Sequence, residues 1–279
     1  MKKVTVLALF VIGVCFLSSS VLAYDDLIYL DRGSKIGDSG TLWGKAGLRY
    51  STAGDMLDKD GEKQSLADDA TGINVPLWAH YTIMENLQAF AILPIVSNDN
   101  GVDSESGVGD IWLGAKYAVL QEGLLSIRGA LDIPTGDDEK GLGNAGGFGI
   151  DIAAQAERQC MLNENINFFG QLGIRYNGED SDTKWNPGLG FYLNGRATYA
   201  VTEKIPAWIA LTYFNRGDGE ADGTEITDSK VSWLELSVGG AYRFTEDMWI
   251  AVPVGYSLTG ANTLAELSIG VYVGYQFMK

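Results

Sequence analysis

The chain has 279 residues, of which 46% are hydrophobic and 36 are glycine. Its 36 acidic residues outnumber 20 basic ones and give a net charge of −16. This argues against a nucleic-acid-binding protein, which needs a basic face for the phosphates. One histidine and two cysteines nearly exclude a zinc site built from those ligands. We therefore expect no nucleic-acid partner, no metal and no cofactor.

Residues 1–23 have the three parts of a secretory signal peptide: a positive start, an apolar core at 4–17, and small residues before Ala23. An uncleaved membrane anchor is the alternative. The core is too short for that, because a helix rising about 1.5 Å per residue needs about 20 residues to cross a bilayer. We expect cleavage after Ala23. Cys160 is then the one remaining cysteine, so no intrachain disulfide can form.

From residue 41 onward, apolar and polar residues alternate with period 2, as in half-buried strands. The pattern predicts an all-β fold, namely a single transmembrane, antiparallel, up-and-down β-barrel of about twelve strands at 41–279. Residues 24–40 would be a periplasmic lead-in or a plug. The predicted strands are 41–50, 73–83, 87–95, 111–119, 125–133, 148–156, 168–176, 189–201, 205–213, 234–244, 248–256 and 267–277.

The connections between these strands alternate between short and long, which is typical of outer-membrane barrels with short periplasmic turns and long extracellular loops. A soluble β-sandwich, the alternative, has no reason to sort its loops by end. The long loops hold most of the acidic excess, and we expect them to be solvated surface. The short connections are 84–86, 121–123, 202–204 and 245–247, with 158–164 somewhat longer; the long ones are 51–72, 97–109, 135–147, 177–187 and 215–230, with a short polar stretch at 258–263.

Eight tyrosines share the apolar parity of the strands and lie near strand ends. This pattern predicts two aromatic belts at the membrane interfaces, with each ring in hydrocarbon and each hydroxyl at the headgroups. We therefore expect a protein of the outer membrane of a Gram-negative bacterium, in contact with lipid and lipopolysaccharide. The last strand resembles the C-terminal signal that outer-membrane assembly machinery reads. The tyrosines are Tyr50, Tyr81, Tyr117, Tyr176, Tyr199, Tyr213, Tyr242 and Tyr256.

The opposite parity predicts which side chains face the barrel interior, where a polar lumen is usual. The inward charges nearly balance, but six of the seven tryptophans also face inward. Two interpretations stay open: the aromatics fill volume, or they line a conduit for apolar or aromatic solutes. The inward aromatics are Trp43, Trp78, Trp112, Trp208, Trp233, Trp249, Phe90, Phe169, Tyr192, Phe214 and Tyr272.

Counting from the short turns predicts cross-strand neighbours inside the barrel. Lys116 should lie opposite Arg128, Trp112 opposite Asp132, and Arg243 opposite Trp249. Two facing cations are costly unless an anion compensates, so Lys116 and Arg128 are candidates to stop a carboxylate or phenolate; a salt-bridge network is the alternative. The candidate binding residues in the lumen are Trp112, Lys116, Arg128, Asp132, Trp208, Trp233, Arg243 and Trp249.

Two glycine-rich stretches resemble a known family. Residues 106–120 (SGVGDIWLGAKYAVL) are similar to a strand motif of the MetA-pathway phenol-degradation family of outer-membrane β-barrel transporters. Residues 131–137 (LDIPTGD) and 141–147 (GLGNAGG) are similar to a loop motif of the same family. The resemblance implies an outer-membrane channel, in some members linked to aromatic or hydrocarbon uptake. It implies no catalytic residues.

Three functions compete for such a barrel. The first is a channel or transporter for small, hydrophobic or aromatic solutes. The second is a structural or surface-presenting barrel that transports nothing. The third, an enzyme, needs a nucleophile or base constellation, and the one histidine, His80, has no evident partner in the sequence. We therefore expect a channel and no enzyme.

Overall fold

The computed structural model describes residues 34–99, 103–120, 124–137, 140, 142–143, 147–180 and 184–278. The predicted signal peptide and most of the predicted lead-in lie outside these residues. No helix in the described part of the chain is long and apolar enough to cross a membrane.

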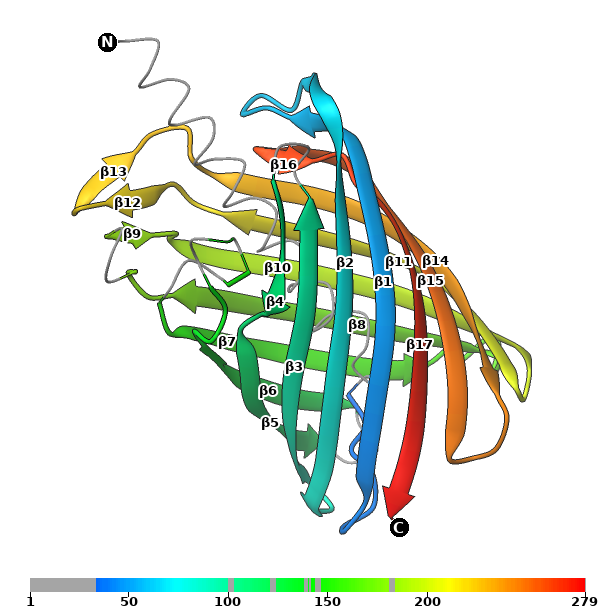
Figure 1. The fold of residues 1–279 in the computed structure, drawn as a ribbon. Coiled ribbons are helices and arrows are strands. Elements are labelled where there is room, and N and C mark those ends of the chain that lie inside the picture. Colours follow the sequence, from blue (N-terminus) through cyan, green and yellow to red (C-terminus); the bar gives the residue numbers. More distant parts are fainter. Residues whose placement is uncertain are drawn as a thin grey trace, which may run out of the picture.

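Twelve long antiparallel strands form one closed barrel (Figure 1). Each strand pairs with the next long strand along the chain, and β1 closes the sheet by pairing with both β2 and β17. Because the barrel is closed, each of the twelve long strands pairs with a neighbour on both sides. The strands are β1 Leu42–Leu57, β2 Lys63–Met84, β3 Leu87–Asp99, β5 Ile111–Leu120, β6 Leu125–Ile133, β7 Gly149–Gln159, β8 Ile166–Asn177, β10 Leu189–Thr202, β11 Ile205–Arg216, β14 Val231–Arg243, β15 Met248–Ala261 and β17 Leu267–Met278.

The predicted parity is confirmed on both faces of the wall. Leu113, Leu131 and Ile150, on three adjacent strands, point outward and are 45–52% exposed. Tyr81 and Tyr242 belong to the predicted belts and are likewise exposed on the outer face. The inward tryptophans at 43, 78, 112 and 233 are at most 5% exposed. An apolar exterior around an interior that holds buried charges such as Arg128 and Asp151 is the reverse of a soluble protein and suits a lipid surround.

The expectation that 51–72 is a loop was wrong. β1 continues to Leu57 and β2 begins at Lys63, so only a tight turn remains at the top of a tall hairpin (Figure 1). The ladder continues beyond the apolar band, where outward positions such as Asp69 are polar and the alternation disappears. At the turn, the backbone N–H groups of Glu62 and Asp60 donate to Asp58. These bonds hold the pKa of the Asp58 carboxyl below its usual value.

Other predicted loops also contain short strands. β4 (Ser104–Val108) pairs with the end of β3, and β16 (Thr263–Leu264) pairs with the end of β1. A separate small sheet joins β9 (Trp185–Asn186), β12 (Gly219–Ala221) and β13 (Thr224–Ile226). All of these lie at one end of the barrel, called here the long-loop end (Figure 1).

The opposite end is called here the short-turn end. The turns after β2, β10 and β14 lie there, as do the first residue of β1 and the last of β17 (Figure 1). Residues 38–41 are fixed to this end of β2, because the Gly40 N–H donates to the Thr82 carbonyl at 2.8 Å and the Ser39 hydroxyl donates to the Ile83 carbonyl at 3.2 Å. The chain therefore enters the barrel beside the short turns.

Candidate functional site

Aromatic rings inside the barrel lie against the wall over glycines. A Cβ on Gly239 would be 2.3 Å from the Trp208 ring, one on Gly274 would be 2.3 Å from the Trp249 ring, and one on Gly47 would be 2.1 Å from the Tyr272 ring. Phe90 over Gly114 and Tyr192 over Gly173 repeat the arrangement; only glycine leaves room for a ring at such a place. Phe90, Tyr192 and Tyr272 are buried in apolar clusters of the interior, whereas Trp208, Trp249 and Tyr272 also line a pocket.

The predicted binding residues fall into three groups, two of which meet where Trp249 packs against the apolar cluster that contains Trp112. Trp112, Lys116, Arg128 and Asp132 lie side by side on β5 and β6, in the predicted register. Trp233 lies at the long-loop end, in an apolar cluster whose other buried members are Met56, Ala153, Tyr192, Phe214 and Val231. Trp208, Arg243 and Trp249 line a pocket at the short-turn end, where Arg243 faces Trp249 as predicted.

The β5–β6 group continues into a buried ion-pair network. Arg128 donates to the Asp151 carboxylate and to the Tyr192 hydroxyl, both at 2.7 Å, and that hydroxyl donates to Asp151 at 2.9 Å. The Nε atom of Arg175 lies 3.6 Å from the other Asp151 oxygen. Arg128, Asp151 and Tyr192 are each 1% exposed.

Asp151 therefore supplies a compensating anion for Arg128, one of the two facing cations. This favours the salt-bridge alternative for Arg128. A role of the pair in stopping a solute anion stays a prediction.

Cations also lie over aromatic rings along the lumen. The Lys45 ammonium is 4.2 Å from the centre of the Trp78 ring, and the Arg175 guanidinium carbon is 4.2 Å from that of Trp112. Arg196 lies 4.9 Å over Phe169. Such contacts hold a charge beside an apolar ring at low desolvation cost, so charged and aromatic residues form one mixed lining rather than separate patches.

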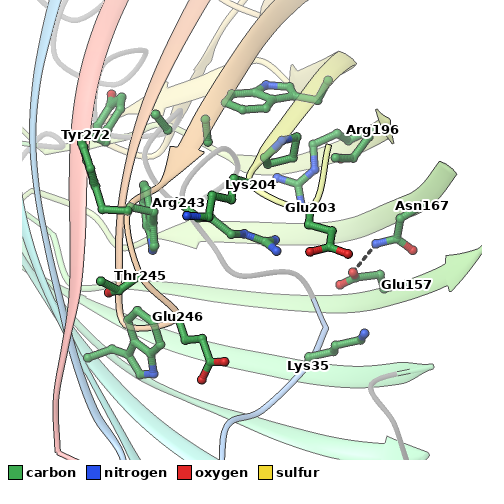
Figure 2. A pocket seen from close by; sticks show the side chains of 18 of the residues that line it. Lys35, Glu157, Asn167, Arg196, Glu203, Lys204, Arg243, Thr245, Glu246 and Tyr272 are labelled. Carbon is green, nitrogen blue, oxygen red and sulfur yellow. Dashed lines mark hydrogen bonds between the residues drawn. The ribbon is translucent and has the colours of Figure 1, made fainter. Parts of the chain in front are cut away.

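The pocket at the short-turn end has a volume of about 940 Å³, within the usual range of small-molecule sites. Four basic side chains, Lys35, Arg196, Lys204 and Arg243, and three acidic ones, Glu157, Glu203 and Glu246, line it (Figure 2). Trp43, Trp208, Trp249 and Tyr272 supply the aromatic wall. The pocket thus combines ring surfaces with charges of both signs.

Several pocket residues were missed from the sequence. Glu203, Lys204 and Glu246 lie in turns, and Lys35 lies before the first strand, where strand parity gives no direction. Arg196 lies on β10 and lines the pocket but is not among the predicted binding residues. These residues could have been found from their position, because charged residues in the turns at the short-turn end surround the mouth of a barrel.

The wall under Trp208 offers a direct test of the ring-over-glycine arrangement. Gly239→Ala puts a methyl group where three atoms of the Trp208 ring now lie within 2.9 Å. We expect this overpacking to lower the free energy of unfolding by about 1–3 kcal/mol in urea titrations of the refolded protein.

Gly129→Ala is the matched control, because a Cβ there meets nothing within 4 Å. Its effect should stay within about 0.5 kcal/mol. Equal effects of the two substitutions would contradict the arrangement.

The chain matches the family model described as "Putative MetA-pathway of phenol degradation" over residues 35–272. The chain belongs to this family. No curated protein matches it. The two motifs on which the family resemblance rested meet in the fold: Asp110 accepts the N–H groups of Thr135 at 3.0 Å and Gly136 at 2.8 Å, and the Thr135 hydroxyl donates to the Gly109 carbonyl.

Two solved structures are similar to this family member. The COG4313 outer membrane channel from Pseudomonas putida F1 is 19% identical, with a TM-score of 0.75, over 88% of this chain and 98% of that chain. The translocator domain of the autotransporter NalP from Neisseria meningitidis is 13% identical, with a TM-score of 0.57, over 94% and 99%. At these identities the likeness concerns the fold, which the two proteins use for different tasks.

Proposed function

We propose that this protein is an outer-membrane channel for small hydrophobic or aromatic solutes. One observation carries the proposal: a pocket of about 940 Å³ at the short-turn end is lined by Trp208, Trp249 and Tyr272, whose rings lie over glycines of the wall. The short-turn end would face the periplasm. The printed name of the Pseudomonas putida relative, an outer membrane channel, supports the same class of function.

The exposed apolar belt would contact lipid and lipopolysaccharide, and assembly machinery of the outer membrane would insert the strands. Residues 24–40 were predicted to be either a lead-in or a plug. In the described part of this segment, Lys35, Ile36 and Gly37 line the pocket. A plugging role for this segment is part of the proposal, because residues 35–37 line the pocket through which a solute would leave.

A structural barrel that transports nothing is the second candidate. The buried network around Asp151 favours it, because ion pairs that fill a barrel add rigidity but narrow any path. An enzyme is not proposed. His80 is 2% exposed, and its ring stacks on that of Trp78 at 5.4 Å and packs on Phe90 at 5.9 Å, an arrangement that leaves little access for a substrate.

Liposome swelling separates the two candidates. The protein is reconstituted, and entry of phenyl glucoside is compared with entry of glucose, which is the same sugar without the ring. A channel with an aromatic lining should admit phenyl glucoside at least as fast as glucose, although it is the larger solute. Trp208→Leu with Trp249→Leu should remove this advantage.

The control is an outward pair, Leu113→Ala with Leu131→Ala, which leaves the lumen unchanged. If neither solute enters faster than in protein-free liposomes, the result supports the second candidate, a structural barrel that transports nothing. If glucose enters and phenyl glucoside enters more slowly, the protein is a channel but has no preference for aromatic solutes.

A further inference from the structure

The pocket at the short-turn end contains two neighbouring cations, Lys204 and Arg243, that form no ion pair with a carboxylate in the described part of the chain. The backbone N–H of Arg243 donates to the Lys204 carbonyl at 2.9 Å, so the two side chains leave adjacent backbone positions on β14 and in the β10–β11 turn. Figure 2 shows both side chains lining the same pocket, with Glu203 and Arg196 nearby.

The cations higher in the lumen differ in this respect. Arg128 and Arg175 share Asp151, and Arg49 lies 3.1 Å from Glu266 and 3.8 Å from Glu235. No ion pair joins Lys204 or Arg243 to a carboxylate among the described residues. Adjacent like charges repel each other, and an anion placed between them relieves that repulsion.

Three acidic side chains, Glu157, Glu203 and Glu246, line the same pocket. The Glu157 carboxylate accepts a hydrogen bond from the Asn167 amide on the neighbouring strand (Figure 2). Glu203 and Glu246 line the same pocket from turns, without an ion pair to Lys204 or Arg243 in the described residues. With Lys35 and Arg196 included, the basic side chains of the lining outnumber the acidic ones by four to three.

An aromatic surface lies directly beside the two cations. Arg243 and Trp249 are register partners on β14 and β15, and facing side chains in a sheet start about 5 Å apart. The Trp249 ring lies over Gly274 and packs against the apolar cluster that contains Tyr272, and the Trp208 ring lies over Gly239; both tryptophans line the pocket. A planar ring could stack on either tryptophan while an attached anionic group reaches the cations.

We propose that this pocket is a binding site for an aromatic carboxylate, whose ring stacks on Trp249 or Trp208 and whose carboxylate bridges Arg243 and Lys204. The inference rests on the proposed channel function and deepens it, because it names a solute class and a place where that solute pauses before release. Arg196, held over Phe169 on the same wall, adds positive potential.

Benzoate and benzamide test the proposal, because they share a ring and differ in charge. Calorimetric titration of the detergent-solubilised full chain should show benzoate binding and much weaker benzamide binding. Lys204→Gln with Arg243→Gln should raise the Kd for benzoate at least about tenfold, the loss expected for a charge-assisted pair, and leave benzamide binding unchanged. Both residues are exposed at the mouth, and a heat-modifiable gel band checks that the variant folds.

Lys59→Gln with Lys63→Gln is the matched control. It removes the same charge from the exposed hairpin turn at the other end of the barrel, and benzoate affinity should change less than about twofold. Equal affinity for benzoate and benzamide, no benzoate binding, or equal loss in both double variants would overturn the proposal.

Channel activity is read separately by liposome swelling. Solute entry into liposomes without the expected benzoate binding supports the proposed channel function but contradicts the proposed binding site. Benzoate binding without any flux keeps the site and removes the channel.

Discussion

Asp151→Ala is expected to lower the free energy of unfolding by about 3–5 kcal/mol, the cost of removing one partner from a buried ion pair. The substitution leaves Arg128, 1% exposed, without the carboxylate that lies 2.7 Å from its guanidinium. It also removes the carboxylate beside Arg175 and the acceptor of the Tyr192 hydroxyl. Urea unfolding of the refolded barrel, followed by tryptophan fluorescence, measures the loss.

Two further variants make this result specific. Asp60→Ala breaks the Lys59–Asp60 pair, whose atoms are 2.8 Å apart but whose side chains are 48% and 66% exposed, so it should cost about 1 kcal/mol or less. Adding Arg128→Met to Asp151→Ala should recover much of the stability, because it removes the uncompensated charge. A loss below 1 kcal/mol for Asp151→Ala would contradict the buried network.

Leu113→Arg is expected to destabilise the inserted barrel by about 2–4 kcal/mol, the cost of an arginine on the lipid face near the bilayer midplane. Leu113 lies within β5, points outward and is 45% exposed. Its neighbours across the ladders, Ala91 and Leu131, are apolar as well, so no charge of the wall compensates the arginine. Urea unfolding in lipid vesicles measures the difference from the unmodified protein.

Leu162→Arg is the matched control, because it makes the same change in the turn between β7 and β8. Leu162 is 97% exposed and lies outside the apolar belt, so its replacement should change stability by less than about 0.5 kcal/mol. If the two substitutions cost the same, Leu113 does not face lipid and the assignment of the outer surface is wrong.

The sequence predicts the barrel because lipid imposes a strict pattern. Between its two belts, a wall strand must alternate between hydrocarbon and lumen, and residues such as Leu113 and Trp112 record that alternation. Counting from tight turns then yields the register, as for Lys116 with Arg128. The upper parts of β1 and β2 escape prediction, since above the membrane both faces of a strand meet water and no alternation is required.

The grouping of the lumen residues is harder to predict. Asp151 and Tyr192 meet although β8 lies between their strands, a contact across the interior that depends on the curvature of the closed wall. Lys204 lines the pocket from a turn, where the alternation of a strand cannot predict the direction of a side chain. The excess of glycine is visible in the composition, but which ring lies over a given glycine is not, since the Trp208 ring over Gly239 comes from the neighbouring strand.

Single-channel recording in a planar bilayer tests the central claim, that the barrel lets solutes cross. Protein that shows a heat-modifiable folded band is added to one side of the membrane, and heat-unfolded protein serves as the control. We expect discrete, reproducible conductance steps for the folded sample alone, and altered steps after Lys204→Gln with Arg243→Gln at the mouth. A folded, inserted barrel that gives no steps at all would contradict the central claim.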